Sequence, residues 1–200
     1  MTLPVRLAVT GISLALFLAM LLAGGSGWRW DEGVYLFLYG DPRLAAPARF
    51  VTELGGWKML VPAAFLGSAA LFAAHRRRDA AILLAMTMGG RLLVWLMKEV
   101  VARPRPALED HLVAVGSASF PSGHGANGLI TWLALALLIP RKSRAVAITA
   151  ALILAFLIGL SRVVLGVHWP SDVIAGWAIG LIWTGGLAAI IRGKSARGPS

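Results

Sequence analysis

The chain has 200 residues, of which 58% are hydrophobic and only 14% are charged. A soluble domain carries about 25% charged residues on average, so this composition excludes an ordinary soluble protein. The absence of cysteine excludes disulfides, thiolate metal sites and a cysteine nucleophile.

Several apolar runs reach the roughly 20 residues that cross a bilayer as a helix. We therefore expect an all-α fold, a polytopic bundle of six transmembrane helices that form a single domain over residues 1–200. Small residues follow the first run and mimic a signal-peptide cleavage site, but the length of the run favours a retained span. The predicted spans are 4–24, 57–75, 80–98, 123–140, 145–163 and 172–191.

The segment 25–56, between the first two runs, is too long for a tight connection and has an apolar pattern of its own. Asp31 is expected to cap a short helix in it, and Pro47 interrupts a second helical repeat. We expect the segment to lie along the membrane surface, either as a lid or as a plain covering. Three tryptophans would anchor it at the interface: Trp28, Trp30 and Trp57.

The net charge of +10 has an uneven distribution along the chain. If six helices alternate in direction, ten of the 19 Lys and Arg fall on one side with a single acid, Asp79. This is the positive-inside pattern. It predicts that both termini are cytoplasmic and that 25–56, 99–122 and 164–171 lie outside. The basic excess therefore indicates topology and does not indicate a nucleic-acid partner.

Basic residues gather where the third run ends. Lys98 closes the run on the outer side, and two prolines keep Arg103 and Arg105 out of helical geometry. On its own such a cluster is commonly a snorkelling fringe. Arg91 lies two turns below Lys98, inside the span, where an arginine normally points into the bundle and has a partner or a task.

The fourth run opens with Pro121, Ser122, Gly123 and His124. Ser122 is a good helix cap, and Gly123 lets a ligand approach the backbone. His124 falls in the first turn, beside the free N–H groups and positive end of a helix, which favour an anion. A histidine there can give a proton to a leaving oxygen, although the pattern also suits an ordinary helix start with an interfacial histidine.

The stretch SRVVLGVHWPSD joins the last two runs. His168 and Asp172 are four residues apart, so on a helix they share a face. The carboxylate can hold the imidazole in one tautomer and stabilise the charge that develops when the other nitrogen reacts. Arg162, across a bend at Gly166, can bind a phosphate through its planar guanidinium. A capping histidine and a snorkelling arginine are the alternative.

All three clusters fall on the outer side of the predicted topology. Together they read Lys98-x6-Arg105-Pro106, Pro121-Ser122-Gly123-His124 and Ser161-Arg162-x5-His168-x3-Asp172. This set resembles the three-part signature of the type-2 phosphatidic acid phosphatase superfamily, which includes bacterial membrane lipid phosphatases, glucose-6-phosphatase and the vanadium haloperoxidases. Each part alone is a weak signal, but all three match in order and without a substitution.

The resemblance implies a role for each matching residue. His168 would be the nucleophile and form a phosphohistidine, Asp172 would orient it, and His124 would protonate the leaving group and later activate water. Phosphoryl transfer needs charge neutralisation around three equatorial oxygens. Arg103 and His111 lie outside the signature, and we expect them to be surface contacts. The phosphoryl oxygens would be held by Lys98, Arg105, Ser122, Gly123 and Arg162.

No metal ion or other cofactor is expected. Three fixed cations can neutralise a phosphoryl group without Mg²⁺. The acids near the motif do not have the spacing of ligands for a divalent ion; they are Glu99, Glu109 and Asp110.

These expectations describe a phosphatase in the bacterial cytoplasmic membrane, with its active site at the outer membrane–water interface. Its substrate would be undecaprenyl diphosphate, phosphatidylglycerol phosphate or phosphatidic acid, with lipid A phosphates as a further candidate. Two alternatives stay open: a lipid phosphotransferase that uses the same site, and a non-catalytic lipid transporter or scaffold. The presence of His124, His168 and Asp172 argues against the non-catalytic alternative.

Overall fold

The computed structural model describes residues 3–193. Helices account for every regular element in this part of the chain, and it contains no strand, which confirms the all-α prediction. Each predicted span coincides with a helix. The helices are α1 (Leu3–Leu22), α2 (Arg29–Leu38), α3 (Pro42–Glu53), α4 (Trp57–Ala73), α5 (Arg77–Val101), α6 (Gly123–Leu138), α7 (Arg141–Val164) and α8 (Pro170–Gly193).

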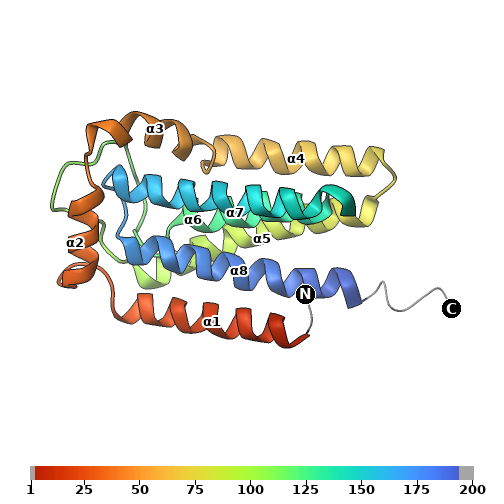
Figure 1. The fold of residues 1–200 in the computed structure, drawn as a ribbon, viewed down its shortest axis with the longest axis horizontal. Helices are drawn as coiled ribbons and strands as arrows, with labels where there is room; N and C mark the ends of the chain where they lie inside the picture. The colour runs from red at the N-terminus through yellow and green to blue at the C-terminus, as the bar shows by residue number, and fades with distance from the viewer. Residues whose placement is uncertain (1–2, 194–200) are drawn as a thin grey trace.

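The long helices run along one axis, whereas the short α2 crosses one end of the bundle (Figure 1). α8 packs between α1 and α6, α7 packs on α6 and α3, and α5 packs on α4 and α6. Apolar side chains of α1, α5, α6 and α8 form one buried cluster around Phe120. This packing holds the ends of α5, α6, α7 and α8 together near the loops that join them.

Four segments are long and apolar enough to cross a membrane: Leu3–Leu22, Pro42–Ala73, Arg77–Val101 and Arg141–Val164. The helix α6 is also apolar but has only 16 residues. The chain thus has the helices of a membrane protein, and the count of six spans stays a prediction.

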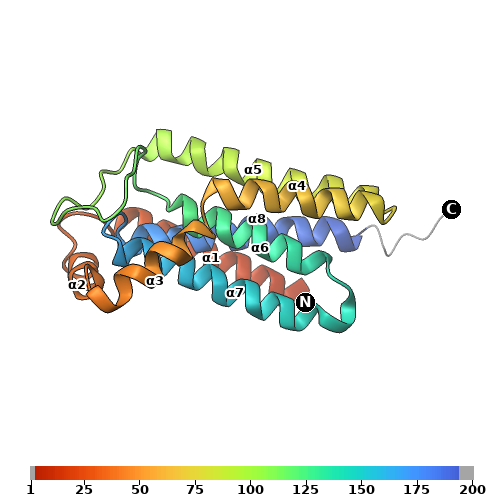
Figure 2. The same cartoon turned by 90° about the horizontal axis from the view of Figure 1, so that it is seen from above.

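The segment 25–56 differs from the surface segment expected from the sequence. Only α2 lies across the bundle end, whereas α3 slants toward the start of α4 and packs along α7 (Figure 2). Asp31 does not cap α2: Trp28 holds that position without a side-chain hydrogen bond, and Asp31 lies in the first turn. Its carboxylate instead accepts hydrogen bonds from the backbone of Gly25 and Ser171.

The two ends of the bundle differ in charge and in structure. The α4–α5 and α6–α7 connections lie at the end opposite α2 (Figures 1 and 2), and the basic groups 76–78 and 141–144 fall at these connections and in the first turns of α5 and α7. The longer loops 102–122 and 165–169 lie at the α2 end. The expected basic tail with Lys194 and Arg197 lies outside the described residues. The cytoplasmic placement of the basic end remains a prediction.

Candidate active site

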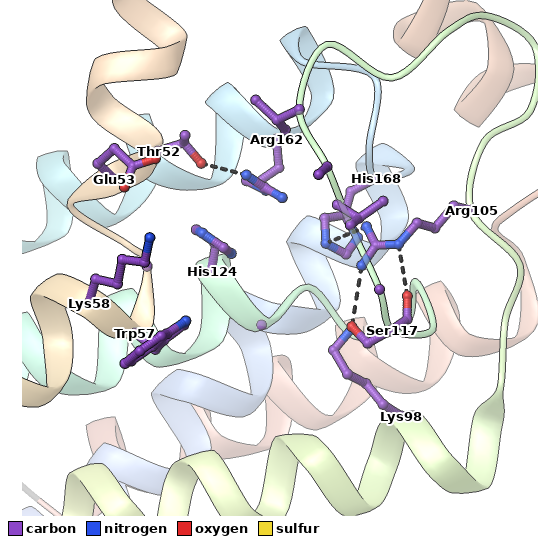
Figure 3. Close-up of a pocket in the computed structure, with 16 residues that line it drawn as sticks. Thr52, Glu53, Trp57, Lys58, Lys98, Arg105, Ser117, His124, Arg162 and His168 are labelled. Atoms are coloured by element: carbon purple, nitrogen blue, oxygen red, sulfur yellow. Dashed lines mark hydrogen bonds between the residues drawn. The ribbon is translucent and has the colours of Figure 1, made fainter.

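A cavity of about 450 Å³ opens among the helix ends that the bundle holds together (Figure 3). Its walls come from the α3–α4 corner, α5, the 102–122 loop, α6, α7 and the loop before α8. Ser122 and Asp172, which are also predicted site residues, are fully buried next to lining residues. The structure therefore brings all eight predicted residues together, six of them on the cavity wall: Lys98, Arg105, Gly123, His124, Arg162 and His168.

His168 faces Asp172 as the sequence predicts, but the two do not share a helix face: His168 lies in the loop before α8, and only Asp172 is in the helix. The imidazole Nδ1 lies 3.3 Å from Oδ2 of Asp172, which also accepts a hydrogen bond from Ser119 Oγ at 2.5 Å. On the other side of the ring, Nη1 of Arg105 lies 3.3 Å from Nε2. Because a guanidinium can only donate, Nε2 is the acceptor and Nδ1 bears the hydrogen that faces Asp172. The lone pair of Nε2 is thus on the cavity side.

The surroundings of His168 keep its ring neutral. Burial, followed by the charges of Arg105, Arg162 and Lys98, lowers the pKa of His168 well below its usual range. A neutral imidazole is the nucleophilic form, because a protonated ring has no free lone pair. The cations that would bind a phosphate therefore also keep this histidine able to attack one.

Four cations line the cavity, and hydrogen bonds to the protein fix three of them. Lys98 donates to carbonyl oxygens of the 118–119 segment, and Nε of Arg105 donates to the carbonyl oxygen of Ser117 at 2.8 Å. Nη1 of Arg162 donates to Thr52 Oγ1 at 2.6 Å, while its buried Nε has no hydrogen-bond partner among the described residues. Pre-positioned donors of this kind suit an anion that gains charge in a transition state.

The start of α6 is tied to the start of α8. Ser122 caps α6 by accepting a hydrogen bond from the Gly125 N–H at 3.4 Å. Its own N–H donates to the carbonyl oxygen of Asp172 at 2.9 Å. The two helices meet closely at Gly176, where a Cβ would lie 2.8 Å from the Ser122 carbonyl oxygen. This contact sets the position of the helix end that faces the cavity.

His124 lies in the first turn of α6 and forms no hydrogen bond to another described residue. Its ring faces the α3–α4 corner: a Cβ built on Gly56 would lie 3.7 Å from His124 Nε2. In Figure 3 it stands between the His168 side of the cavity and the wall with Trp57 and Lys58. His124 is therefore positioned across the cavity from the candidate nucleophile.

Comparison with known proteins identifies the family. The family model described as PAP2 superfamily matches residues 79–195, more than half of the chain and all three motifs. The chain belongs to the PAP2 superfamily.

Individual relatives agree with this membership. Phosphatidylglycerophosphatase B of Bacillus subtilis is 33% identical over 138 residues, which cover 66% of this chain and 68% of that protein. Decaprenylphosphoryl-5-phosphoribose phosphatase of Mycobacterium tuberculosis is 34% identical over 150 residues, which cover 72% of this chain and 78% of that protein. The crystal structure of a transmembrane PAP2-type phosphatidylglycerolphosphate phosphatase from Bacillus subtilis superimposes with a TM-score of 0.83 and 26% sequence identity. The match covers 94% of this chain and 96% of that one. The chain is accordingly a phosphatase of this superfamily.

Arg103 is not the surface contact expected from the sequence of this PAP2 protein. Its guanidinium donates to Oδ1 of Asp172 at 2.9 Å and to Ser171 Oγ at 3.0 Å. It also donates to the carbonyl oxygens at the end of α1 and lies 4.3 Å above the Phe120 ring. The buried carboxylate of Asp172 needs a counter-charge, and Arg103 supplies it through Oδ1. Arg105 instead lies on the cavity side of His168, next to Nε2.

Asp31 is a second residue that the sequence did not connect with the site. It is fully buried, and besides its backbone contacts it accepts a hydrogen bond from Ser171 Oγ at 2.5 Å. Burial raises the pKa of Asp31, while these hydrogen bonds oppose that rise. Asp31 thereby caps the first turn of α8, in which Asp172 lies. No local pattern relates it to a serine 140 residues away.

Arg91 and His111 lie away from the catalytic cluster. Arg91 is half-buried on α5, does not line the cavity, and has no hydrogen bond or ion pair to another described residue. The task expected of an arginine within a span is therefore not at this cavity. His111 is exposed in the loop, as expected, with Nε2 2.8 Å from the carbonyl oxygen of Pro106.

Proposed function

We propose that this protein hydrolyses a phosphomonoester or diphosphate of a membrane lipid through a phosphohistidine on His168. The observation that carries the proposal is the arrangement of His168, with Nδ1 facing Asp172 and Nε2 facing a cavity lined by cations. Only an imidazole held in this tautomer offers its lone pair to a phosphorus atom in the cavity.

The reaction proceeds in two displacements. The Nε2 lone pair attacks phosphorus and forms a P–N bond while the P–O bond to the leaving group breaks, and His124, in its imidazolium form, gives its proton to the leaving oxygen and becomes neutral. Water then attacks the phosphohistidine, His124 takes up the water proton, and breakage of the P–N bond releases phosphate. Lys98, Arg105 and Arg162 neutralise the equatorial oxygens in both steps.

The lipid nature of the substrate is supported by the fold and by the relatives. The apolar helices place the chain in a bilayer, and the names of the similar phosphatases refer to lipids. Phosphatidylglycerol phosphate, undecaprenyl diphosphate and phosphatidic acid are the substrates we propose to test. The basic residues at the far end of the bundle support an active site at the outer face of the cytoplasmic membrane.

The experiment is phosphate release by the purified protein in detergent, from each of these lipids, with EDTA present. We expect activity to persist in EDTA, because the proposed chemistry uses fixed cations in place of Mg²⁺. His168→Ala and His124→Ala should each abolish release while the protein stays folded, and Asp172→Asn should reduce it strongly through the wrong imidazole tautomer.

Two outcomes would contradict the proposal. Normal turnover by His168→Ala would exclude the phosphohistidine, and a strict Mg²⁺ requirement would exclude the metal-independent route. Consumption of the lipid phosphate that occurs only when a lipid hydroxyl is added, with the phosphoryl group transferred to that hydroxyl, would identify a phosphotransferase.

A further inference from the structure

The polar side chains on the two sides of the cavity differ in whether other residues of the protein form hydrogen bonds with them. On the His168 side, Arg105 and Lys98 are held by loop carbonyl oxygens. On the side of the α3–α4 corner, Lys58 lines the cavity and has no hydrogen bond or ion pair to another described residue. His124 is equally without a partner there. Apart from the buried Nε of Arg162, the side chains without a partner therefore lie near the corner, where Lys58 is exposed to solvent.

In-line attack decides which part of a substrate meets this corner. A nucleophile and a leaving group lie on opposite sides of the phosphorus. With His168 as the nucleophile, the leaving oxygen points toward His124, and the rest of the leaving group continues toward the α3–α4 corner. Figure 3 shows this sequence across the cavity, from His168 through His124 to Trp57 and Lys58.

The charge of the cavity exceeds what one phosphate can neutralise. Four basic side chains line it, Lys58, Lys98, Arg105 and Arg162, against a single acid, Glu53, so its lining residues carry a net charge of at least +3, before the proton that His124 donates is counted. A phosphomonoester contributes about −1.5 to −2 at pH 7. At least one positive charge is left over. Glu53 interacts electrostatically with Arg162, and Asp172 with Lys98 and Arg105. Among the described residues, Lys58 is therefore the lining cation without a counter-charge.

Building on the proposed function, we propose that Lys58 and the start of α4 bind a second phosphate, one that the leaving group carries. The preferred substrates would then be lipids in which a further phosphate lies beside the scissile one, as a lipid diphosphate or as a phosphodiester with a terminal phosphomonoester. Phosphatidic acid has no such group. The uncapped first turn of α4 adds backbone N–H donors next to Lys58.

The test compares kcat/KM for phosphatidylglycerol phosphate and for phosphatidic acid with the same acyl chains. Lys58→Gln should lower kcat/KM about tenfold for the first lipid, at the lower end of what a charged hydrogen bond contributes, and less than threefold for the second. Lys58→Arg should restore most of the preference. Lys142→Gln is the matched control, since Lys142 is exposed at the opposite end of the bundle.

A third substrate, undecaprenyl diphosphate, distinguishes a second phosphate bonded directly to the scissile one from a second phosphate one glycerol away. A larger loss for the diphosphate would place the subsite directly beside the scissile bond, and a larger loss for phosphatidylglycerol phosphate would place it one glycerol farther away. Hydrolysis of all three lipids with unchanged ratios in Lys58→Gln would overturn this inference and leave the proposed function standing. Failure of the wild-type protein to release phosphate from any lipid would overturn the proposed function, and this inference with it.

Discussion

Replacement of Arg103 by methionine tests the least expected contact of the site. The substitution keeps an apolar stem over Phe120 but removes the charge that faces Asp172. The side chain of Arg103 is only 9% exposed and that of Asp172 is completely buried, so water cannot take the place of the guanidinium. Removal of one partner of a buried ion pair costs about 3–5 kcal/mol.

The expected result is a loss of at least about 3 kcal/mol in the free energy of unfolding. For a chain of this size that corresponds to a fall in Tm of roughly 6 °C or more. A folded fraction should also show a reduced kcat, because Asp172 loses the bond that holds its Oδ1 while Oδ2 faces His168. Arg103→Lys keeps the charge but not the planar fork, so it should recover part of both losses.

Arg76→Met is the control for Arg103→Met. Arg76 also pairs with an aspartate, Asp79, at 2.7 Å, but in that pair the side chains are 39% and 26% exposed. An exposed pair contributes about 0.2–1 kcal/mol. Thermal unfolding in detergent and phosphate release would be measured for both variants. If Arg103→Met melts and turns over like Arg76→Met, Arg103 is not the counter-charge of Asp172 and the reasoning is refuted.

Two further predictions concern helix packing and pH. Gly176→Ala should cost about 1–3 kcal/mol and lower turnover, because its Cβ would lie 2.8 Å from the Ser122 carbonyl oxygen. The control is Gly185→Ala in the same helix, whose Cβ meets nothing within 4 Å and which should change neither stability nor turnover. Equal Tm values for the two variants would contradict this prediction. His168 has a lowered pKa, so below its usual value of about 6.5 the unfolded chain binds more protons than the folded one, and stability is lost as the pH falls. The Tm of the wild type should therefore drop more between pH 7 and pH 5 than that of His168→Gln, and parallel curves would show that the pKa is not lowered.

The helices and the catalytic cluster could be predicted from the sequence because their signals are local. Apolar runs of sufficient length predict helices wherever they occur, and every predicted span coincides with one. The cap at Ser122 likewise depends only on neighbouring residues, and His168 and Asp172 are close enough in the sequence to meet although His168 precedes α8. The resemblance to the superfamily then added roles to residues that the structure places around one cavity.

The partners of these residues were decided by the tertiary structure alone. Arg103 reaches Asp172 across 69 positions and Asp31 reaches Ser171 across 140, while Thr52 holds Arg162 across 110. Two arginines two residues apart, Arg103 and Arg105, look alike in the sequence, yet one supports the carboxylate and the other faces the cavity. Apolar patterning determines which segments are helices. Which side chains meet at the helix ends depends on how those helices pack, and no local pattern contains that information.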